Sequence, residues 1–248
     1  MNDAPLGVFD SGIGGLTVAR ALFERLPHEA VLYFGDTARV PYGPKSPETV
    51  RRYSAEILAY LIGRGVKAVV VACNTSTAHA LDHLRSRASV PVVGVIEPGA
   101  RAAVAASRSG TIEGLRPDAT VVSAACPLFV PLVEEGWFDH PAAELIARDY
   151  LEPLRRSGVD VVVLGCTHYP LLKPLLQRVL GAGVQLIDSA EETAAQVVKE
   201  LAARDLAASA RPRPEHVFAV SDDEPRFRRV GERFLGERLK QVSVVPLG

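Results

Sequence analysis

A short segment occurs twice in this chain, and each copy ends in a cysteine. Residues 65–73 (GVKAVVVAC) align without gaps on residues 158–166 (GVDVVVLGC). Both copies are apolar up to the cysteine, and polar residues that can start a helix follow it, which is typical of a buried strand leading into a helix. Two similar halves, each with a thiol at the carboxyl end of a strand, predict two α/β domains that face each other across a cleft.

Short β-branched runs alternate with longer amphipathic stretches along the chain. Apolar runs without alternation indicate strands covered on both faces, as in parallel sheets joined by right-handed crossovers. The pattern therefore predicts the α/β class, with two doubly wound parallel-sheet domains and the active site in the cleft between them. We expect strands at 6–10, 30–35, 68–73, 90–96, 119–124, 159–165, 184–187 and 216–220, and helices at 15–26, 47–63, 76–86, 99–107, 142–157, 169–180, 190–208 and 224–235.

The second copy of the repeat is incomplete. In the first half, a strand, a glycine-rich loop and a helix precede the run at 32–36. The second half passes from the helix at 99–107 almost directly into the run at 120–123. We therefore expect a strand–helix unit to be missing and the second domain to be shortened.

Composition excludes several classes of protein. The 28 basic and 29 acidic side chains give a net charge of -1 without a basic run, which argues against nucleic-acid binding. The apolar blocks are too short to cross a bilayer, and the N-terminus does not resemble a signal peptide. Three cysteines without a close pair argue against a disulfide framework or a zinc site and favour a reducing, cytoplasmic location.

The polar residues after each repeated cysteine suggest chemistry. Cys73 precedes Asn74 and Thr75, where a helix N-terminus would favour a thiolate and donate to an anionic ligand. A single such cysteine is most often a small buried core residue. Cys166, followed by Thr167, has the same context in the other half, so the duplication favours a pair of reactive thiols.

Two further residues lie near these thiols in the predicted fold. His168 could relay protons for Cys166 or only cap the next helix. Asp10 opens the loop DSGIGG, which lacks the GxGxxG spacing of a dinucleotide site, and its carboxylate would repel a pyrophosphate. We expect Asp10 to orient a catalytic thiol or accept its proton, and the loop glycines to let N–H groups approach a substrate carboxylate.

A second loop, at 36–43, follows the second strand on the same edge of the sheet. Its Pro-Tyr-Gly-Pro run could be an ordinary turn, but its position favours a binding role that includes Asp36. Glu134 lies in a segment that starts a helix and could be a surface charge. Cys126 has no polar helix start after it and is interpreted as structural.

Taken together, these segments resemble the glutamate racemases of the aspartate/glutamate racemase superfamily. The matching runs lie in family order at 7–17, 33–43, 71–75, 94–100, 126–134, 164–170 and 234–236. The resemblance implies two α/β domains related by a pseudo-twofold axis. The first comprises residues 1–97 and 207–248, and the second comprises residues 98–206. The resemblance further implies a homodimer. It also implies interconversion of L- and D-glutamate without a cofactor or metal, which would supply D-glutamate for peptidoglycan.

The resemblance assigns roles to individual residues. Cys73 and Cys166 would be the two bases, one removing the α-proton while the other returns a proton to the opposite face. Asp10 would assist Cys73, His168 would assist Cys166, and Glu134 matches a further acid near the site. The implied substrate-binding residues are Ser11, Pro41, Tyr42, Gly43, Asn74, Thr75 and Thr167.

One departure and two alternatives accompany this resemblance. Family members have a strand with a Gly-Thr loop after the run at 94–100, where this chain has only residues 107–118. One alternative is a racemase of the same superfamily acting on aspartate or a hydantoin. The other is a non-catalytic binding or regulatory protein that kept the fold, although the presence of both cysteines argues against it. A metal enzyme is disfavoured because Cys73, Cys166 and His168 would leave a metal short of ligands.

Overall fold

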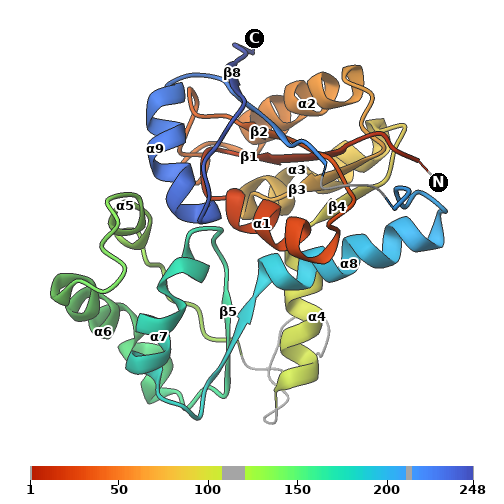
Figure 1. The fold of residues 1–248 in the computed structure, drawn as a ribbon. Helices are drawn as coiled ribbons and strands as arrows, with labels where there is room; N and C mark the ends of the chain where they lie inside the picture. Colours follow the sequence, from red (N-terminus) through yellow and green to blue (C-terminus); the bar gives the residue numbers. More distant parts are fainter. Residues whose placement is uncertain (1, 108–120, 211–213, 248) are drawn as a thin grey trace.

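The computed structural model describes residues 2–107, 121–210 and 214–247, and its larger sheet has six parallel strands (Figure 1). The strand order is β4-β3-β1-β2-β7-β8. All the pairings in this sheet are parallel, as expected from the uninterrupted apolar runs. The strands are β1 (Leu6–Asp10), β2 (Val31–Gly35), β3 (Ala68–Val71), β4 (Val92–Gly94), β7 (Val217–Val220) and β8 (Val242–Val244).

Helices cover both faces of this sheet, because successive residues of a strand point to opposite sides. In β1, Val8 packs with Leu16 of α1 and Phe227 of α9, whereas Phe9 packs in a separate core with Ile57 of α2. The larger sheet is therefore the middle layer of three. Its main covering helices are α1 (Leu16–Arg25), α2 (Pro47–Gly63), α3 (Asn74–Arg87), α8 (Ser189–Ala203) and α9 (Glu224–Leu235).

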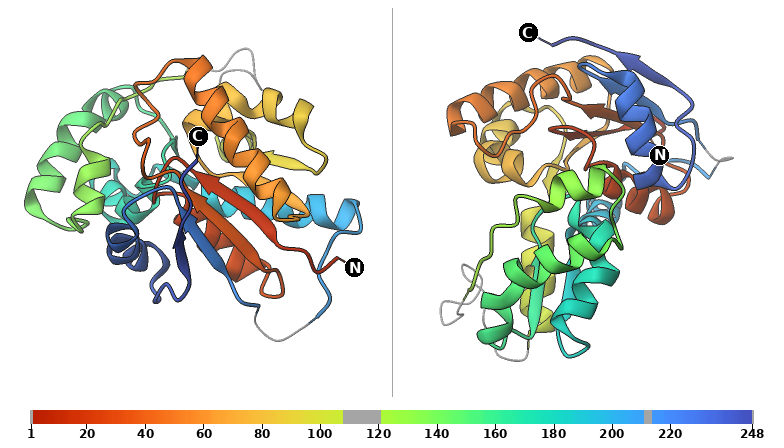
Figure 2. Two further views of the ribbon diagram at one scale, coloured as in Figure 1. Left: turned by 90° about the horizontal axis from the view of Figure 1, so that it is seen from above. Right: turned by 90° about the vertical axis from the view of Figure 1, so that its left-hand side faces the viewer.

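The second unit of the fold surrounds a smaller sheet, drawn in green and teal in Figures 1 and 2. Within the described residues this sheet has two parallel strands, β5 (Val161–Leu164) and β6 (Gln185–Asp188). The missing strand–helix unit is predicted at 107–118, and residues 108–118 lie outside the described ranges. The helices of the second unit are α4 (Ile96–Ala106), α5 (Phe129–Glu134), α6 (Pro141–Arg156), the 3-10 turn η1 (Tyr169–Leu172) and α7 (Lys173–Leu180).

The structure confirms the repeat. β3 leads through Cys73 into α3 and pairs in parallel with β4, and β5 leads through Cys166 into η1 and pairs in parallel with β6. Both cysteines therefore follow the carboxyl end of a strand, where open α/β sheets bind their ligands. The chain returns to the larger sheet through β7 and β8, as the resemblance implies. The domain boundaries at 97/98 and 206/207 stay a prediction.

One predicted strand is wrong over the residues that the structure describes. Residues 121–124 form no strand, and residues 119–120 lie outside the described ranges. A strand needs a hydrogen-bonded neighbour, and a cavity lies between this segment and β5. β8 was not predicted because its apolar run is short. Smaller differences concern α4, which begins at Ile96 rather than 99, and α8, which ends at Ala203 rather than 208.

No helix in the described ranges is long and apolar enough to cross a bilayer.

Candidate active site

A cavity of about 360 Å³ lies where the carboxyl ends of the strands in the two sheets meet, and both repeated cysteines line it. The loops after β1, β2 and β3 contribute from the larger sheet, and the loop after β5 contributes from the smaller one. The repeat thus delivers two thiols to one cavity. The predicted site residues that line the cavity are Asp10, Ser11, Pro41, Tyr42, Gly43, Cys73, Asn74, Thr75, Glu134, Cys166, Thr167 and His168.

Cys73 caps the N-terminus of α3, as its sequence context predicts. Its Sγ accepts a hydrogen bond from the backbone N–H of Ser76 at 3.4 Å, and its thiol donates to Oγ of Ser11 at 3.5 Å. Asn74 and Thr75 form the first turn of the helix and face the same cavity. This helix start can donate hydrogen bonds to an anionic ligand held beside the thiol.

Burial affects the ionisation of Cys73 more strongly than the start of the helix does. Burial raises the pKa of its thiol, and the nearby carboxylate of Asp10 raises it further, against the opposing effect of the Ser76 N–H and the Ser11 hydroxyl. The side chain is only 4% exposed, so the cost of burying a charge outweighs stabilisation by the helix terminus. Cys73 therefore rests as a thiol that can donate a proton.

Cys166 has a different set of neighbours. Its Sγ lies 3.8 Å from Nδ1 of His168, and Nε2 of His168 lies 3.1 Å from Oε1 of Glu134. Burial lowers the pKa of His168, but the Cys166 sulfur and the Glu134 carboxylate raise it more strongly, to about 10. The imidazole is therefore protonated at neutral pH, and its positive charge stabilises negative charge on the adjacent sulfur.

The carboxylate of Glu134 stays ionised beside this histidine. Burial raises the pKa of Glu134, but His168 and Arg226 lower it by a larger amount. Asp10 behaves differently, because burial raises its pKa and the charge of His168 and the loop N–H groups only partly offset this. The site therefore combines two thiols with acids and a base in different charge states, as proton transfer requires.

The loops that carry the two cysteines are joined directly. Oγ1 of Thr17, in the first turn of α1, lies 3.0 Å from the carbonyl of Gly14 and 2.9 Å from the carbonyl of Thr167. Oδ2 of Asp10 accepts the N–H of Gly12 at 2.9 Å, and the hydroxyl of Tyr33 donates to the carbonyl of Gly12 at 3.0 Å. These contacts fix the glycine-rich loop against the loop of Cys166.

Asp36 does not line the cavity, so we revise the predicted binding role. Its fully buried carboxylate accepts hydrogen bonds from Tyr42, from Arg39 at 2.7 Å and from Ser221 at 2.8 Å. Because Tyr42 and its neighbours line the cavity, Asp36 supports the binding loop from behind.

Three lining residues come from the C-terminal helix and had no predicted role. Asp223, Arg226 and Phe227 lie at the start of α9 and reach the cavity from the larger sheet. The sequence predicts this helix, but nothing in its local pattern indicates that it lies against the acid of α5, far away along the chain.

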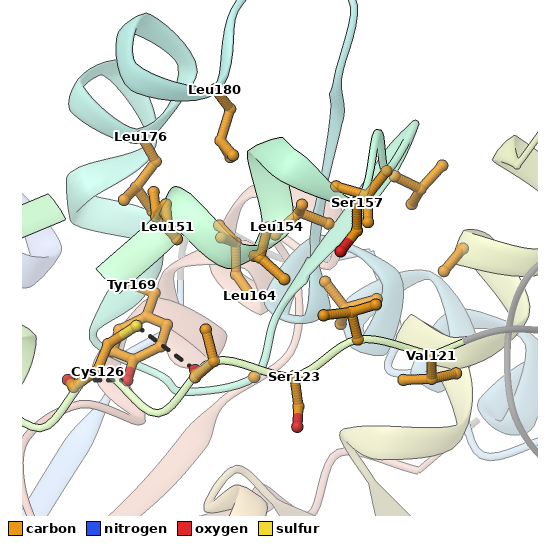
Figure 3. A pocket seen from close by; sticks show the side chains of 18 of the residues that line it. Val121, Ser123, Cys126, Leu151, Leu154, Ser157, Leu164, Tyr169, Leu176 and Leu180 are labelled. Carbon is orange, nitrogen blue, oxygen red and sulfur yellow. Dashed lines mark hydrogen bonds between the residues drawn. The ribbon is translucent and has the colours of Figure 1, made fainter. Parts of the chain in front are cut away.

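A second and larger cavity of about 670 Å³ lies in the second unit (Figure 3). Val121 and Ser123 line one side, β5 and Leu154 of α6 line another, and Cys126 lies near one end. Neither Cys73 nor Cys166 is among the described residues that line it. The unpaired segment at 121–124 borders this space. Cys126 is buried with Tyr169 donating to its carbonyl at 3.2 Å, which agrees with its structural interpretation.

Within the described ranges, no three His, Cys, Asp or Glu side chains are grouped as a metal site would require.

The fold, the paired thiols and the sequence define the class of protein together. The Asp/Glu/hydantoin racemase family model matches residues 15–121 and 114–197, and the chain belongs to this family of amino-acid racemases. Within the family its similarity is to glutamate racemases. One from Geobacter metallireducens is 51% identical over 98% of this chain and 96% of its own length.

Solved structures give the same result. Glutamate racemase isoform RacE1 from Bacillus anthracis matches with a TM-score of 0.94 and 36% identity, covering 99% of this chain and 98% of that one. Glutamate racemase from Francisella tularensis, solved in complex with D-glutamate, matches with a TM-score of 0.89 and 35% identity over the same shares. The alignment with the Geobacter relative spans 260 positions, whereas this chain has 248 residues. The relative therefore has residues without a counterpart here.

Proposed function

We propose that this protein interconverts L- and D-glutamate without a cofactor, with one of Cys73 and Cys166 removing the α-proton and the other donating its own proton to the opposite face. The observation that carries the proposal is that both thiols line one cavity, each with its own set of proton-transfer partners. Racemisation needs a base on one face of the α-carbon and an acid on the other. Two cysteines delivered by two halves of a repeat supply that arrangement.

The protonation states of the two thiols determine the direction of each proton transfer. In one direction the Cys166 thiolate takes the α-proton, so a C–H bond breaks and an S–H bond forms. The electron pair left on the substrate delocalises into its α-carboxylate. The Cys73 thiol then donates its proton to the opposite face, and the product leaves with inverted configuration. The reverse reaction starts from the Cys73 thiolate and the Cys166 thiol.

The surroundings of the thiols support the carbanion-like state. Asn74 and Thr75 at the start of α3, with Thr167 across the cavity, can donate to the α-carboxylate as it gains negative charge. Asp10 lies near Cys73 and His168 lies beside Cys166, so each thiol has a group that can exchange a proton with it or balance its charge. Closing of the cavity around a substrate would exclude water and strengthen these interactions.

Glutamate is the proposed substrate because of the chain's similarity to glutamate racemases, one of which was solved with D-glutamate. We further propose that the protein acts in the cytoplasm, supplies D-glutamate for peptidoglycan and forms a homodimer. Light scattering of the purified protein tests the dimer, and complementation of a D-glutamate auxotroph tests the supply role.

The decisive experiment follows the optical activity of L- and D-glutamate by circular dichroism, with protein dialysed against a chelator. Cys73→Ala and Cys166→Ala are each expected to lose about a thousandfold in turnover, within the range for general acid–base groups. Cys126→Ala is the matched control, because Cys126 lines the other cavity. A folded wild-type protein inert on both enantiomers would refute the proposal. Turnover of aspartate or a hydantoin in its place would favour the superfamily alternative.

A further inference from the structure

Helix α9 of the larger sheet holds the acid–base partners of Cys166, which belong to the second unit. Nη2 of Arg226 lies 2.7 Å from Oε2 of Glu134, and Nη1 of Arg233 lies 3.2 Å from the carbonyl oxygen of Glu134. The ring of Phe234 packs edge-on against His168, with centroids 5.3 Å apart. One helix therefore contacts both the glutamate and the histidine behind the second thiol.

The two carboxylate oxygens of Glu134 have separate partners. Oε1 lies against Nε2 of His168 at 3.1 Å, and Oε2 is bound by Arg226. With Oε2 occupied, the carboxylate cannot rotate freely, so Oε1 stays directed at the imidazole. The imidazole in turn keeps Nδ1 facing Sγ of Cys166 at 3.8 Å. The contacts form a continuous series from the guanidinium to the thiol.

We propose that Arg226 is a positioning residue for proton transfer at Cys166, acting through Glu134 and His168. This inference rests on the proposed two-thiol function. Arg226 lines the cavity as well as binding Glu134, and its helix α9 contacts α1 and β8, whereas α5, which carries Glu134, contacts η1. Through this contact between Arg226 and Glu134, the position of the larger sheet also affects the position of the groups around Cys166.

A simple surface ion pair is the competing explanation, since the Arg226 side chain is 51% exposed. Such pairs contribute little to stability, and their loss would not change proton transfer at one thiol selectively. Turnover rates alone cannot distinguish the two explanations, because they do not separate proton transfer at one thiol from proton transfer at the other. The equilibrium constant between two enantiomers is one, so kcat/KM must be equal in both directions for every variant.

Primary isotope effects on α-deuterated L- and D-glutamate supply the directional readout. The variants are Arg226→Gln and Arg226→Lys, with Arg229→Gln as control, because Arg229 is exposed on the same helix. We expect Arg226→Gln to lower kcat/KM by about 10-fold to 100-fold, less than loss of a whole acid–base group. The isotope effect should rise for the enantiomer whose α-hydrogen faces Cys166 and fall for the other. Arg226→Lys should recover part of the loss.

Cys166→Ser identifies the relevant enantiomer, because slower proton transfer at residue 166 must raise the isotope effect on the enantiomer whose α-hydrogen faces that residue. Isotope effects in Arg226→Gln that stay equal to those of Arg229→Gln would overturn the proposal while leaving the two-thiol function intact. A wild-type protein that does not racemise glutamate would overturn the proposed function first, and this inference with it.

Discussion

Gly14 and His168 approach each other so closely that a side chain cannot fit between them. A Cβ atom on Gly14 would lie 2.4 Å from Nδ1 of His168 and 2.1 Å from Oγ1 of Thr167. The glycine-rich loop after β1 therefore sets the position of the histidine that faces Cys166. This contact explains on steric grounds why a residue without a side chain occupies position 14.

Replacing Gly14 by alanine should therefore damage catalysis more than folding. The added methyl group must displace the imidazole, and a shift of about 1 Å can cost about 100-fold in rate. Gly63→Ala is the matched control, because nothing lies within 4 Å of the Cβ added there. Turnover by circular dichroism and thermal melting measure the two effects. Turnover equal to that of Gly63→Ala would contradict the steric explanation.

The raised pKa of His168 predicts a loss of stability at alkaline pH. The folded protein holds this proton up to about pH 10, whereas the unfolded chain releases it near 6.5. The stabilising contribution is therefore complete below pH 6.5 and is lost as the pH rises towards about 10. Urea unfolding of the wild type and of His168→Gln at several pH values measures it. The difference between their unfolding free energies should shrink across this window, and a constant difference would exclude the assignment.

Asp36→Asn tests the revised role of that residue. The amide keeps the shape but removes the charge that Arg39 faces and weakens the acceptor for Tyr42 and Ser221. We expect a loss of about 3 kcal/mol in unfolding free energy, at the lower end for a disrupted buried ion pair. The KM for glutamate should rise more than kcat falls, because the binding loop moves but the thiols do not. A fall in kcat alone would instead indicate direct participation in proton transfer.

A buried ion pair away from the cavity allows a test of stability without catalysis. Nζ of Lys67 lies 2.5 Å from Oε2 of Glu29, and their side chains are 0% and 3% exposed. Lys67→Met leaves a buried unpaired carboxylate and should cost about 3–5 kcal/mol. The double variant Lys67→Met/Glu29→Gln should recover much of this loss. Chemical denaturation measures both, and kcat of the folded fraction should stay unchanged. Additive losses in the double variant would show that the two residues are not coupled.

The sequence predicts much of the site because its chemistry is local. The apolar run before Cys73 and the polar run after it identify a strand end and a helix start, and the duplication at Cys166 adds a second thiol on the same kind of edge. Parallel pairing then brings the loops after β1 and β3 together, and the loop after β5 meets them at the cavity. The other cavity-lining positions that were predicted lie in short motifs next to these strand ends, where the family resemblance assigned them.

What the sequence could not predict depends on contacts between distant segments. The partners of Asp36 include Ser221 on the loop after β7, and Arg226 meets Glu134 from another helix. The ionisation of Cys73 also depends on burial by the whole fold, which outweighs the local effect of its helix. No strand forms over residues 121–124 for a similar reason, because strand propensity does not supply a neighbouring strand.

The position of β7 and α9 near the end of the chain has a consequence for biosynthesis. β7 pairs with β2, so β2 remains an open sheet edge while a ribosome translates the residues between them. Arg226 is also made long after Glu134 and His168. A nascent chain can therefore carry both cysteines and still lack the contact of Arg226 with Glu134 until α9 emerges from the exit tunnel.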